Sequence, residues 1–261
     1  MSQPVFRFAP SPNGYLHLGH AYSALLNARM AGEIGGRLLL RIEDTDETRS
    51  RPEFVQAIFE DLGWLGLQWE TPVRIQSEHL ADYDANLAAL WQAGAIYPCF
   101  CSRKQALAHA RQTRDPDGQP HYGGSCRSLP RAEAEARLRR GDIHGWRIDM
   151  ARVNDDEAAA WGDAMIAKRH VGSSYHIAVV TDDALQGVTH VVRGKDIEPA
   201  TPLHRLLQRL LGLPTPHYHH HQLICDDGGQ KLSKSLASTS LRELRAEGIT
   251  PDEIRRRLGT A

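Results

Sequence analysis

The sequence predicts an α/β protein with a doubly wound, mostly parallel Rossmann-type sheet, a zinc-bearing insertion and a short helical tail. Two observations lead to this class. The chain opens with an apolar strand, a periodic helix and a second strand rich in leucine, which is the order of a βαβ unit. Three of the four cysteines then lie between Cys99 and Cys126, in a segment rich in Arg, Gly and Pro. Such a change of composition indicates an insertion.

The opening βαβ unit is predicted element by element. Residues 5–9 form a short apolar strand, and residues 10–14 form a rigid loop with two prolines and a glycine. Residues 16–34 have helical periodicity and end at Gly35 and Gly36, a helix-ending pair. Leu38, Leu39, Leu40 and Ile42 form an apolar strand, as expected of a parallel strand covered on both faces.

The remaining elements follow from the same patterns. Helices are predicted at residues 51–63, 79–93, 104–112, 130–140 and 202–211, and strands at 146–148, 164–167, 177–181, 188–192 and 222–225. Thr250 and Glu253 form a capping box with Pro251 at the first helical position, which opens a last, basic helix. We therefore divide the chain into two halves of a nucleotide-binding catalytic domain (1–98 and 165–235), an inserted subdomain (99–164) and a tail (236–261).

Composition narrows the class of protein. Hydrophobic residues make up 41% of the chain and the net charge is −1, so a disordered chain is excluded. Neither a membrane span nor a secretory signal is apparent, so we expect a cytoplasmic protein with no membrane partner. Residues 99–147 hold ten Lys and Arg against five Asp and Glu. This local positive charge suits an acidic polymer such as nucleic acid.

The first motif that carries chemistry surrounds His17 and His20, at the start of the long helix. A helix N-terminus attracts phosphate, because its unpaired N–H groups and the helix dipole point there. Histidines three residues apart share a helix face, so both rings can reach a triphosphate, and Gly19 leaves room for an adenine ring. The alternative is an ordinary helix start with two surface histidines.

The second motif lies at residues 231–235, after a stretch that contains Gly228 and Gly229. A loop with Lys231 and Lys234 can clamp a pyrophosphate as its negative charge develops. Taken alone, such a loop is usually only solvated. Together with the histidine motif it indicates nucleotide chemistry.

These two motifs carry a resemblance to a known family. His17-Leu18-Gly19-His20 and the lysine motif at 231–235 resemble the two signatures of class I aminoacyl-tRNA synthetases. Residues 7–12, 40–46 and 186–194 are similar to the glutamyl branch of that family, and the similarity extends from about residue 5 to 235. Only 26 residues follow Ser235, so the chain resembles the shortened paralogues within this branch.

The resemblance implies an activity. It implies activation of L-glutamate with ATP and Mg²⁺ in the absence of tRNA. Glutamate would then pass to the queuosine at the wobble position of tRNA(Asp), and we expect the enzyme to be a monomer. His17, His20 and Lys234 would be catalytic, and the set that binds ATP would add Pro10, Ser11, Gly19, Lys231 and Ser233.

The resemblance also implies a glutamate pocket. Its members would be Arg7, Ala9, Ser11, Glu43, Tyr175 and Arg193. The chemistry agrees, because arginines bind carboxylates in a bidentate manner and Glu43 suits the ammonium group. Arg193 would read the side-chain carboxylate. The alternatives are a solvated turn or metal loop for residues 43–46 and a core aromatic for Tyr175.

The cysteine cluster predicts one structural zinc site. Cys99, Cys101 and Cys126 supply three thiolates, and tetrahedral zinc needs a fourth ligand. Ligand chemistry alone favours His121, because imidazole is a common ligand, whereas the resemblance implies Tyr122. We take Tyr122 as the ligand, with His121 as the rival. The alternative is a set of buried thiols without metal.

Two other features receive a simpler interpretation. Cys225 lies in an apolar strand and is expected to be inert core. The histidines between 217 and 221 could suggest a metal site, but alternation along a strand would place them on both faces. We favour a polar strand end near the ATP pocket.

Three other functions remain open at this point. The chain could be a minimal synthetase that charges the 3′ end of a glutamate tRNA. It could be a catalytically inert zinc protein that binds RNA. It could also be another class I nucleotidyltransferase that makes a small-molecule adenylate, which would need a pocket different from the set of Arg7, Glu43 and Arg193.

Overall fold

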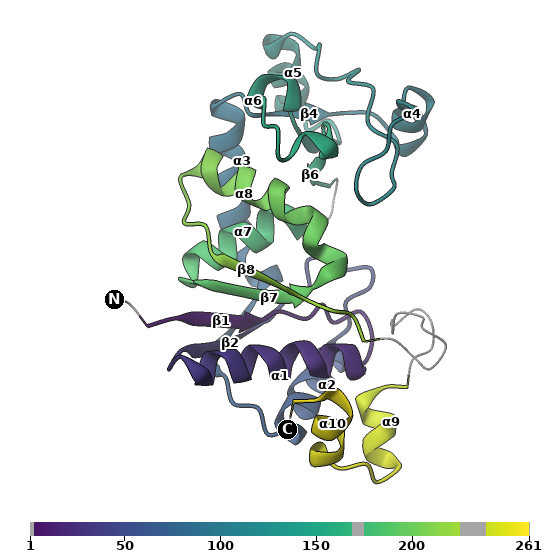
Figure 1. Ribbon diagram of the computed structural model, residues 1–261. Helices are drawn as coiled ribbons and strands as arrows, with labels where there is room; N and C mark the ends of the chain where they lie inside the picture. Colours follow the sequence, from purple (N-terminus) through teal and green to yellow (C-terminus); the bar gives the residue numbers. More distant parts are fainter. Residues whose placement is uncertain (1–2, 169–174, 225–238, 261) are drawn as a thin grey trace. The chain divides into compact units, whose positions relative to one another are not determined.

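The computed structural model describes residues 3–168, 175–224 and 239–260 (Figure 1). The chain divides into two compact units. Unit 1 consists of Met1–Glu78, Gln186–Glu198 and Pro216–Ala261, and unit 2 consists of His79–Leu185 and Pro199–Thr215. The predicted insertion, residues 99–164, lies within unit 2, which starts earlier, at His79.

Unit 1 contains a five-stranded parallel sheet. Its strands, in chain order, are β1 (Val5–Phe8), β2 (Arg37–Ile42), β3 (Glu70–Ile75), β7 (His190–Gly194) and β8 (His217–His221). Their order in the sheet is β3-β2-β1-β7-β8, and every pairing is parallel. The strand order reverses between β1 and β7, where ligands bind in doubly wound sheets. The predicted fold class is confirmed.

Helices pack on one face of this sheet. They are α1 (Leu18–Glu33), α2 (Pro52–Trp64), α9 (Leu241–Ala246) and α10 (Pro251–Leu258). Their shared core includes Phe8, Leu40, Ile58, Leu241 and Ile254, all buried. Short 3₁₀ helices η1 (Gln76–His79) and η3 (Lys195–Ala200) follow β3 and β7.

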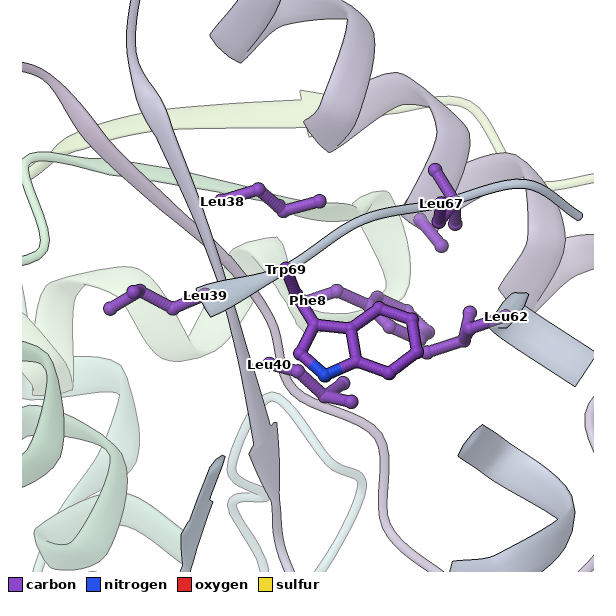
Figure 2. A pocket seen from close by; sticks show the side chains of 8 residues that line it. Phe8, Leu38, Leu39, Leu40, Leu62, Leu67 and Trp69 are labelled. Carbon is purple, nitrogen blue, oxygen red and sulfur yellow. The ribbon is translucent and has the colours of Figure 1, made fainter. Parts of the chain in front are cut away.

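The core of unit 1 includes a small pocket whose lining is apolar throughout. Its lining residues are Phe8, Ala24, Leu38, Leu39, Leu40, Leu62, Leu67 and Trp69. Figure 2 shows the indole of Trp69 among Phe8, Leu40 and Leu62. Its lining consists of hydrophobic side chains with no charged group to orient a ligand, so we regard it as a packing feature of the core.

Unit 2 combines a small antiparallel sheet with helices. The sheet has the order β4-β5-β6, formed by β4 (Ile96–Cys99), β5 (Gly145–Ile148) and β6 (Met165–Ala167). The helices are α3 (Leu80–Gln92), α4 (Arg103–Ala108), α5 (Arg131–Arg139), α6 (Met150–Val153), α7 (Tyr175–Leu185) and α8 (Thr201–Leu211), with the 3₁₀ helix η2 (Ala159–Trp161). Buried hydrogen bonds join α3 to α7, as in the 2.9 Å bond that Tyr83 donates to Asp182.

Residues 177–181 were predicted as a strand, and this prediction is wrong. They lie in the middle of α7, and Ile177, Ala178, Val179 and Val180 are all at most 2% exposed. A helix that is buried on most sides shows no 3.6-residue periodicity. A short apolar run therefore cannot be distinguished from a buried strand by its pattern.

The prediction of a strand at residues 222–225 is also wrong. Residues 222–224 form no strand, and Cys225 lies outside the described residues. The strand is β8, which comes directly before them and consists of His217, Tyr218, His219, His220 and His221. It lies at one edge of the sheet and pairs with β7 through its backbone, so its polar side chains hide it from a hydropathy pattern.

Two further strands had no counterpart among the predicted elements. β3 is the other edge strand, and its residues are half-buried or exposed. β4 is fully buried but contains Pro98 and only four residues. Among the described residues, no helix reaches the length and apolar character needed to cross a membrane.

Candidate functional site

Three buried arginines lie on one face of the sheet in unit 1. They are Arg7 on β1, Arg41 on β2 and Arg193 on β7, and none is more than 5% exposed. The residues two positions before them form one apolar cluster on that face: Val5, Leu39 and Val191. Because strand side chains alternate, the arginines share this face. The sheet therefore concentrates positive charge near the carboxyl ends of its central strands.

Glu43 follows β2 and is held by one of these arginines. Arg41 Nη2 lies 3.3 Å from Glu43 Oε1, and Arg41 Nη1 donates to Gln186 Oε1 at 3.0 Å. The side chains of Arg41 and Glu43 are 0% and 9% exposed. Arg41 was not among the predicted site residues. Its spacing of two from Glu43 at the end of a strand was the signal that could have identified it.

Arg193 is held by strand β8. Its Nε donates to His220 Nε2 at 3.4 Å, and its guanidinium carbon lies 5.1 Å from the ring centroid of Tyr218. His220 Nδ1 lies 3.8 Å from Glu198 Oε1. His217 and His219 point to the opposite face and are exposed. The histidine run is therefore scattered over both faces, as strand alternation predicts.

His17 and His20 form the start of α1 and contact each other. His17 Nδ1 accepts from Gly19 N at 3.1 Å, and His17 N donates to His20 Nδ1 at 3.2 Å, so the pair makes a capping box. Their ring centroids are 3.9 Å apart. A Cβ at Gly19 would lie 2.9 Å from His17 Cε1. The glycine is thus required by the His17 ring itself.

The loop before α1 is fixed by backbone hydrogen bonds. Pro10 O accepts from Glu43 N at 3.1 Å, and Ser11 O accepts from Asn13 N at 3.0 Å. Ala9 joins β1 to this loop. The loop and Glu43 therefore lie together at the carboxyl ends of β1 and β2.

Lys231, Ser233 and Lys234 lie outside the described residues. The chain that follows them returns to the histidine motif: Ser240 forms an antiparallel bridge with His17, and Leu241 N donates to Leu16 O at 2.8 Å. Ser240 was not predicted to belong to the site. It lies beside His17 at the start of α1.

The acidic residues after Glu43 have structural partners. Asp44 accepts from Ser77 N at 2.8 Å and from Ser77 Oγ at 2.6 Å. The hydrogen bond from the Thr48 hydroxyl holds the pKa of Asp46 below its usual value. These contacts favour an ordered turn over a metal loop. Within the described ranges, the single group of three metal-ligating side chains is formed by cysteines.

Tyr175 begins α7 in unit 2, whereas the other predicted glutamate residues belong to unit 1. Its half-buried ring has its centroid 5.5 Å from that of His176 and 5.5 Å from that of His204. His176 Nδ1 and His204 Nε2 are 3.2 Å apart. Tyr175 therefore belongs to an aromatic cluster within its own unit.

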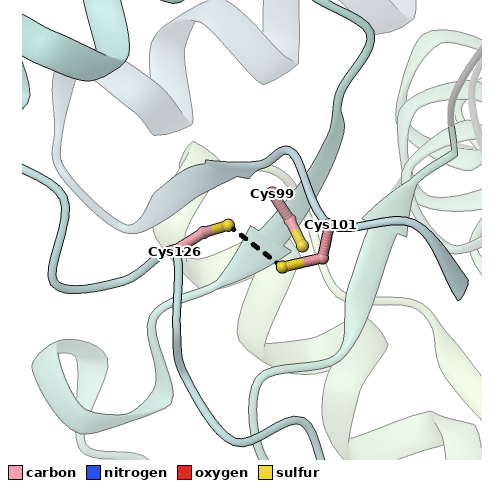
Figure 3. Close-up of side chains that lie close together, drawn as sticks. All are labelled: Cys99, Cys101 and Cys126. Carbon is pink, nitrogen blue, oxygen red and sulfur yellow. Dashed lines mark hydrogen bonds between the residues drawn. The ribbon is translucent and has the colours of Figure 1, made fainter. Parts of the chain in front are cut away.

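The three predicted cysteine ligands come together in unit 2, as Figure 3 shows. Their sulfurs all lie within 4.8 Å of one another, and Cys101 Sγ is 3.4 Å from Cys126 Sγ. Tyr122 OH lies 3.1 Å from Cys101 Sγ and accepts from Cys126 N at 3.0 Å. Tetrahedral zinc with Zn–S bonds of about 2.3 Å places its sulfurs about 3.8 Å apart. This donor set fits such an ion.

His121, the rival fourth ligand, is engaged elsewhere. Its Nδ1 lies 2.9 Å from Thr113 Oγ1, and its Nε2 lies 2.9 Å from Ala160 O. Both ring nitrogens thus have oxygen partners. The geometry favours Tyr122 beside the thiols.

Two thiols of the cluster have pKa values that are shifted in opposite directions. The hydrogen bond with Cys126, followed by burial, raises the pKa of Cys99 to about 12. The same bond lowers the pKa of Cys126 to about 6. Burial raises the pKa of the Tyr122 phenol. In the absence of a cation, Cys126 is therefore the first of these groups to ionise.

The sequence of this chain is similar to those of known proteins. Residues 5–260 match the family described as tRNA synthetases class I (E and Q), catalytic domain. The chain is 45% identical to the glutamyl-Q tRNA(Asp) synthetase of Rhodobacter capsulatus, over 98% of this chain and 99% of that protein. It is 39% identical to the protein of the same name in Symbiobacterium thermophilum, over 95% of this chain and 83% of that one.

A solved structure shows the same fold in a longer protein. The glutamate-tRNA synthetase of Elizabethkingia anophelis superposes with a TM-score of 0.75 and 26% identity. The match covers 95% of this chain and 54% of that synthetase. This chain therefore spans about half of that synthetase but nearly all of the Rhodobacter relative.

Proposed function

Because the chain belongs to the class I tRNA synthetases for glutamate and glutamine, and among them to the glutamyl-Q tRNA(Asp) synthetases, we propose that it glutamylates queuosine. It is a ligase that uses ATP and Mg²⁺, with glutamate and tRNA as substrates. In the proposed reaction, L-glutamate is activated without tRNA. Glutamate then passes to the queuosine at the wobble position of tRNA(Asp).

In the first step, the glutamate α-carboxylate attacks the α-phosphate of ATP and pyrophosphate leaves. His17 and His20 each accept a backbone N–H at Nδ1, so in the neutral ring the proton lies on Nε2. Each ring then offers an N–H donor to phosphate at the positive end of α1. With Lys231 and Lys234, they stabilise charge that develops in the transition state, and no side chain acts as a nucleophile.

Glutamate selection rests on the buried charges of unit 1. We assign Arg7 and Arg193 to the carboxylates and Glu43 to the ammonium group. Arginine guanidinium groups bind carboxylates in a bidentate manner, and the Glu43 carboxylate can accept hydrogen bonds from an ammonium group. Ala9 and Ser11, in the segment that follows β1, are assigned to the same pocket, and Tyr175 stays a predicted glutamate-binding residue.

In the second step, a hydroxyl of the queuosine cyclopentenediol attacks the carbonyl carbon of the adenylate. The hydroxyl loses its proton, an ester bond forms and AMP leaves. The positive charge of residues 99–147 is the proposed contact for the tRNA backbone. Binding should then weaken steeply as salt rises.

The cysteine cluster is the proposed zinc site. Cys99, Cys101, Tyr122 and Cys126 would hold the ion, and its chemistry would be structural, because four protein ligands leave no open position. The ion would connect the end of β4 to the loop that contains Tyr122 and Cys126. No reaction step requires it.

The match with the Rhodobacter relative over nearly its full length is the observation that carries this proposal. The test is ATP–pyrophosphate exchange with each of the twenty amino acids in the absence of tRNA. Transfer of the active amino acid to tRNA(Asp) with and without queuosine follows. Exchange specific for glutamate, with transfer only to queuosine-containing tRNA, is the expected result.

Two results would contradict the proposal. Exchange that requires glutamate tRNA, with acylation of the 3′ end, would indicate a minimal glutamyl-tRNA synthetase. No exchange with any amino acid would rule out the adenylate mechanism and favour a zinc protein that binds RNA. A His17→Ala variant serves as the control that the measured exchange belongs to this site.

A further inference from the structure

Arg147 lies beside the cysteine cluster and belongs to none of the roles assigned above. It is on β5, where Gly145 pairs with Cys99 and Arg147 pairs with Tyr97. Residues opposite each other in an antiparallel pair share a face, as do residues two apart. Arg147 and Cys99 therefore lie on the same face of the sheet in unit 2.

The guanidinium of Arg147 is held against the tyrosine of the cluster. Its central carbon lies 4.1 Å from the centroid of the Tyr122 ring, within the range of a cation–π contact. Its Nη1 donates to Asp163 O at 2.8 Å. The carboxylate of Asp163 is fixed in turn by Tyr97, whose hydroxyl donates to it at 2.6 Å. The arginine is thus positioned from two sides.

One donor of Arg147 lacks an acceptor. Its Nε is buried and makes no hydrogen bond within the part of the chain that the structure describes. Buried N–H groups almost always have a partner, so an exception needs a physical reason. Zinc bound by three thiolates and a phenolate would carry a net charge of −2, and its electron-rich ligands would be acceptors for such a donor.

We propose that Arg147 is the charge-neutralising partner of the zinc site. Its Nε–H donates to the bound ligands, while its guanidinium plane covers the phenolate ring of Tyr122. This inference rests on the proposed zinc site. Outer partners of this kind orient metal ligands and strengthen binding. The planar guanidinium is required, because a lysine ammonium can neither stack on the ring nor keep the Nε donor.

The test measures zinc affinity of the full chain by competition with a chromogenic chelator. Arg147→Met removes the charge and keeps the bulk, and Arg147→Lys keeps the charge and removes the planar donor. Arg131→Met is the matched control, because Arg131 makes a similar cation–π contact in the same unit, with its guanidinium carbon 4.3 Å from the centroid of the Trp91 ring. We expect affinity to fall about 10- to 100-fold for Arg147→Met and at least fivefold for Arg147→Lys. The control should stay within about twofold of the parent protein.

A second readout follows the ligands directly. Cobalt in place of zinc gives thiolate charge-transfer bands, and these should shift in Arg147→Lys but not in Arg131→Met. Equal affinity in the Arg147 and Arg131 variants, with unchanged cobalt bands, would overturn the role of Arg147 and leave the zinc site intact. If the parent protein binds no zinc, the zinc site and this role both fail. If Arg147→Met does not fold, the zinc affinity and cobalt bands of Arg147→Lys decide whether Arg147 has this role.

Discussion

Arg193 and His220 face each other on neighbouring parallel strands, and Arg193 Nε donates to His220 Nε2 at 3.4 Å. This bond aims the arginine that we assign to the glutamate side chain. It also gives a function to one member of the histidine run, whereas its neighbours His217 and His219 are exposed.

His220→Ala should raise KM for glutamate about tenfold in ATP–pyrophosphate exchange and leave kcat within about twofold. The reason is that one hydrogen bond to a charged group is lost and the guanidinium gains freedom. His219→Ala, on the opposite face of the same strand, is the control and should change neither parameter. Equal effects of the two substitutions would show that His220 does not position Arg193.

The Arg41–Glu43 pair should be important for stability. Arg41→Met leaves the carboxylate of Glu43 buried without this partner, and we expect a loss of about 3 kcal/mol in the free energy of unfolding. Arg37→Met is the control, because Arg37 pairs with Glu70 on the surface, where both side chains are over 40% exposed. The loss in free energy of unfolding caused by Arg37→Met should stay below about 1 kcal/mol. Urea unfolding measures both, and similar losses would contradict the buried character of the first pair.

Gly19→Ala should abolish most glutamate-dependent exchange. The added Cβ would lie 2.9 Å from His17 Cε1, so the imidazole must leave its position at the start of α1. Gly32→Ala lies on the same helix with nothing within 4 Å of the new methyl group. We expect it to keep full activity and to gain about 0.5–1 kcal/mol of stability. An active Gly19→Ala enzyme would show that the ring position is not essential.

Asp61 should make stability depend on pH. Burial raises the pKa of this carboxyl to about 6, and both of its oxygens are buried with no hydrogen-bond partner among the described residues. The folded protein thus binds the Asp61 proton more tightly than the unfolded chain does. Its contribution is favourable at low pH and is lost as pH rises from about 4 through 6, a total of roughly 3 kcal/mol.

The variant Asp61→Asn removes this titration. The difference in unfolding free energy between the parent protein and Asp61→Asn should therefore change with pH between 4 and 6 and stay constant above about 7. Glu33→Gln, which removes an exposed carboxyl on α1, is the control. A difference that does not vary with pH would mean that the carboxyl titrates normally.

Tyr122→Phe should weaken zinc retention during dialysis against a chelator, because it removes the oxygen that lies 3.1 Å from Cys101 Sγ. His121→Ala should retain zinc, because the His121 ring is bonded to Thr113 and to the Ala160 carbonyl. Metal content after dialysis measures both. Loss of zinc from His121→Ala alone would identify histidine as the fourth ligand.

The sequence by itself determined the βαβ opening and the α/β class, and it predicted the candidate site residues. β2 contains the apolar residues Leu38, Leu39, Leu40 and Ile42, and α1 has a helical periodicity that ends at Gly35 and Gly36. Both are local properties of the sequence. The cysteine spacing and the order of the two signature motifs are likewise readable without coordinates. Identity of side chains and short-range periodicity are sufficient for these conclusions.

Only the tertiary structure decided which residues hold these elements and the candidate site residues in place. Residues 177–181 form a helix because α3 and α8 pack around them, and β8 is a strand because β7 supplies its backbone partners. The contacts of Arg41 with Gln186, of Arg193 with His220 and of Arg147 with Tyr122 join residues that are far apart in the chain. Burial and partner geometry arise from packing across such distances, and a local pattern contains no information about them.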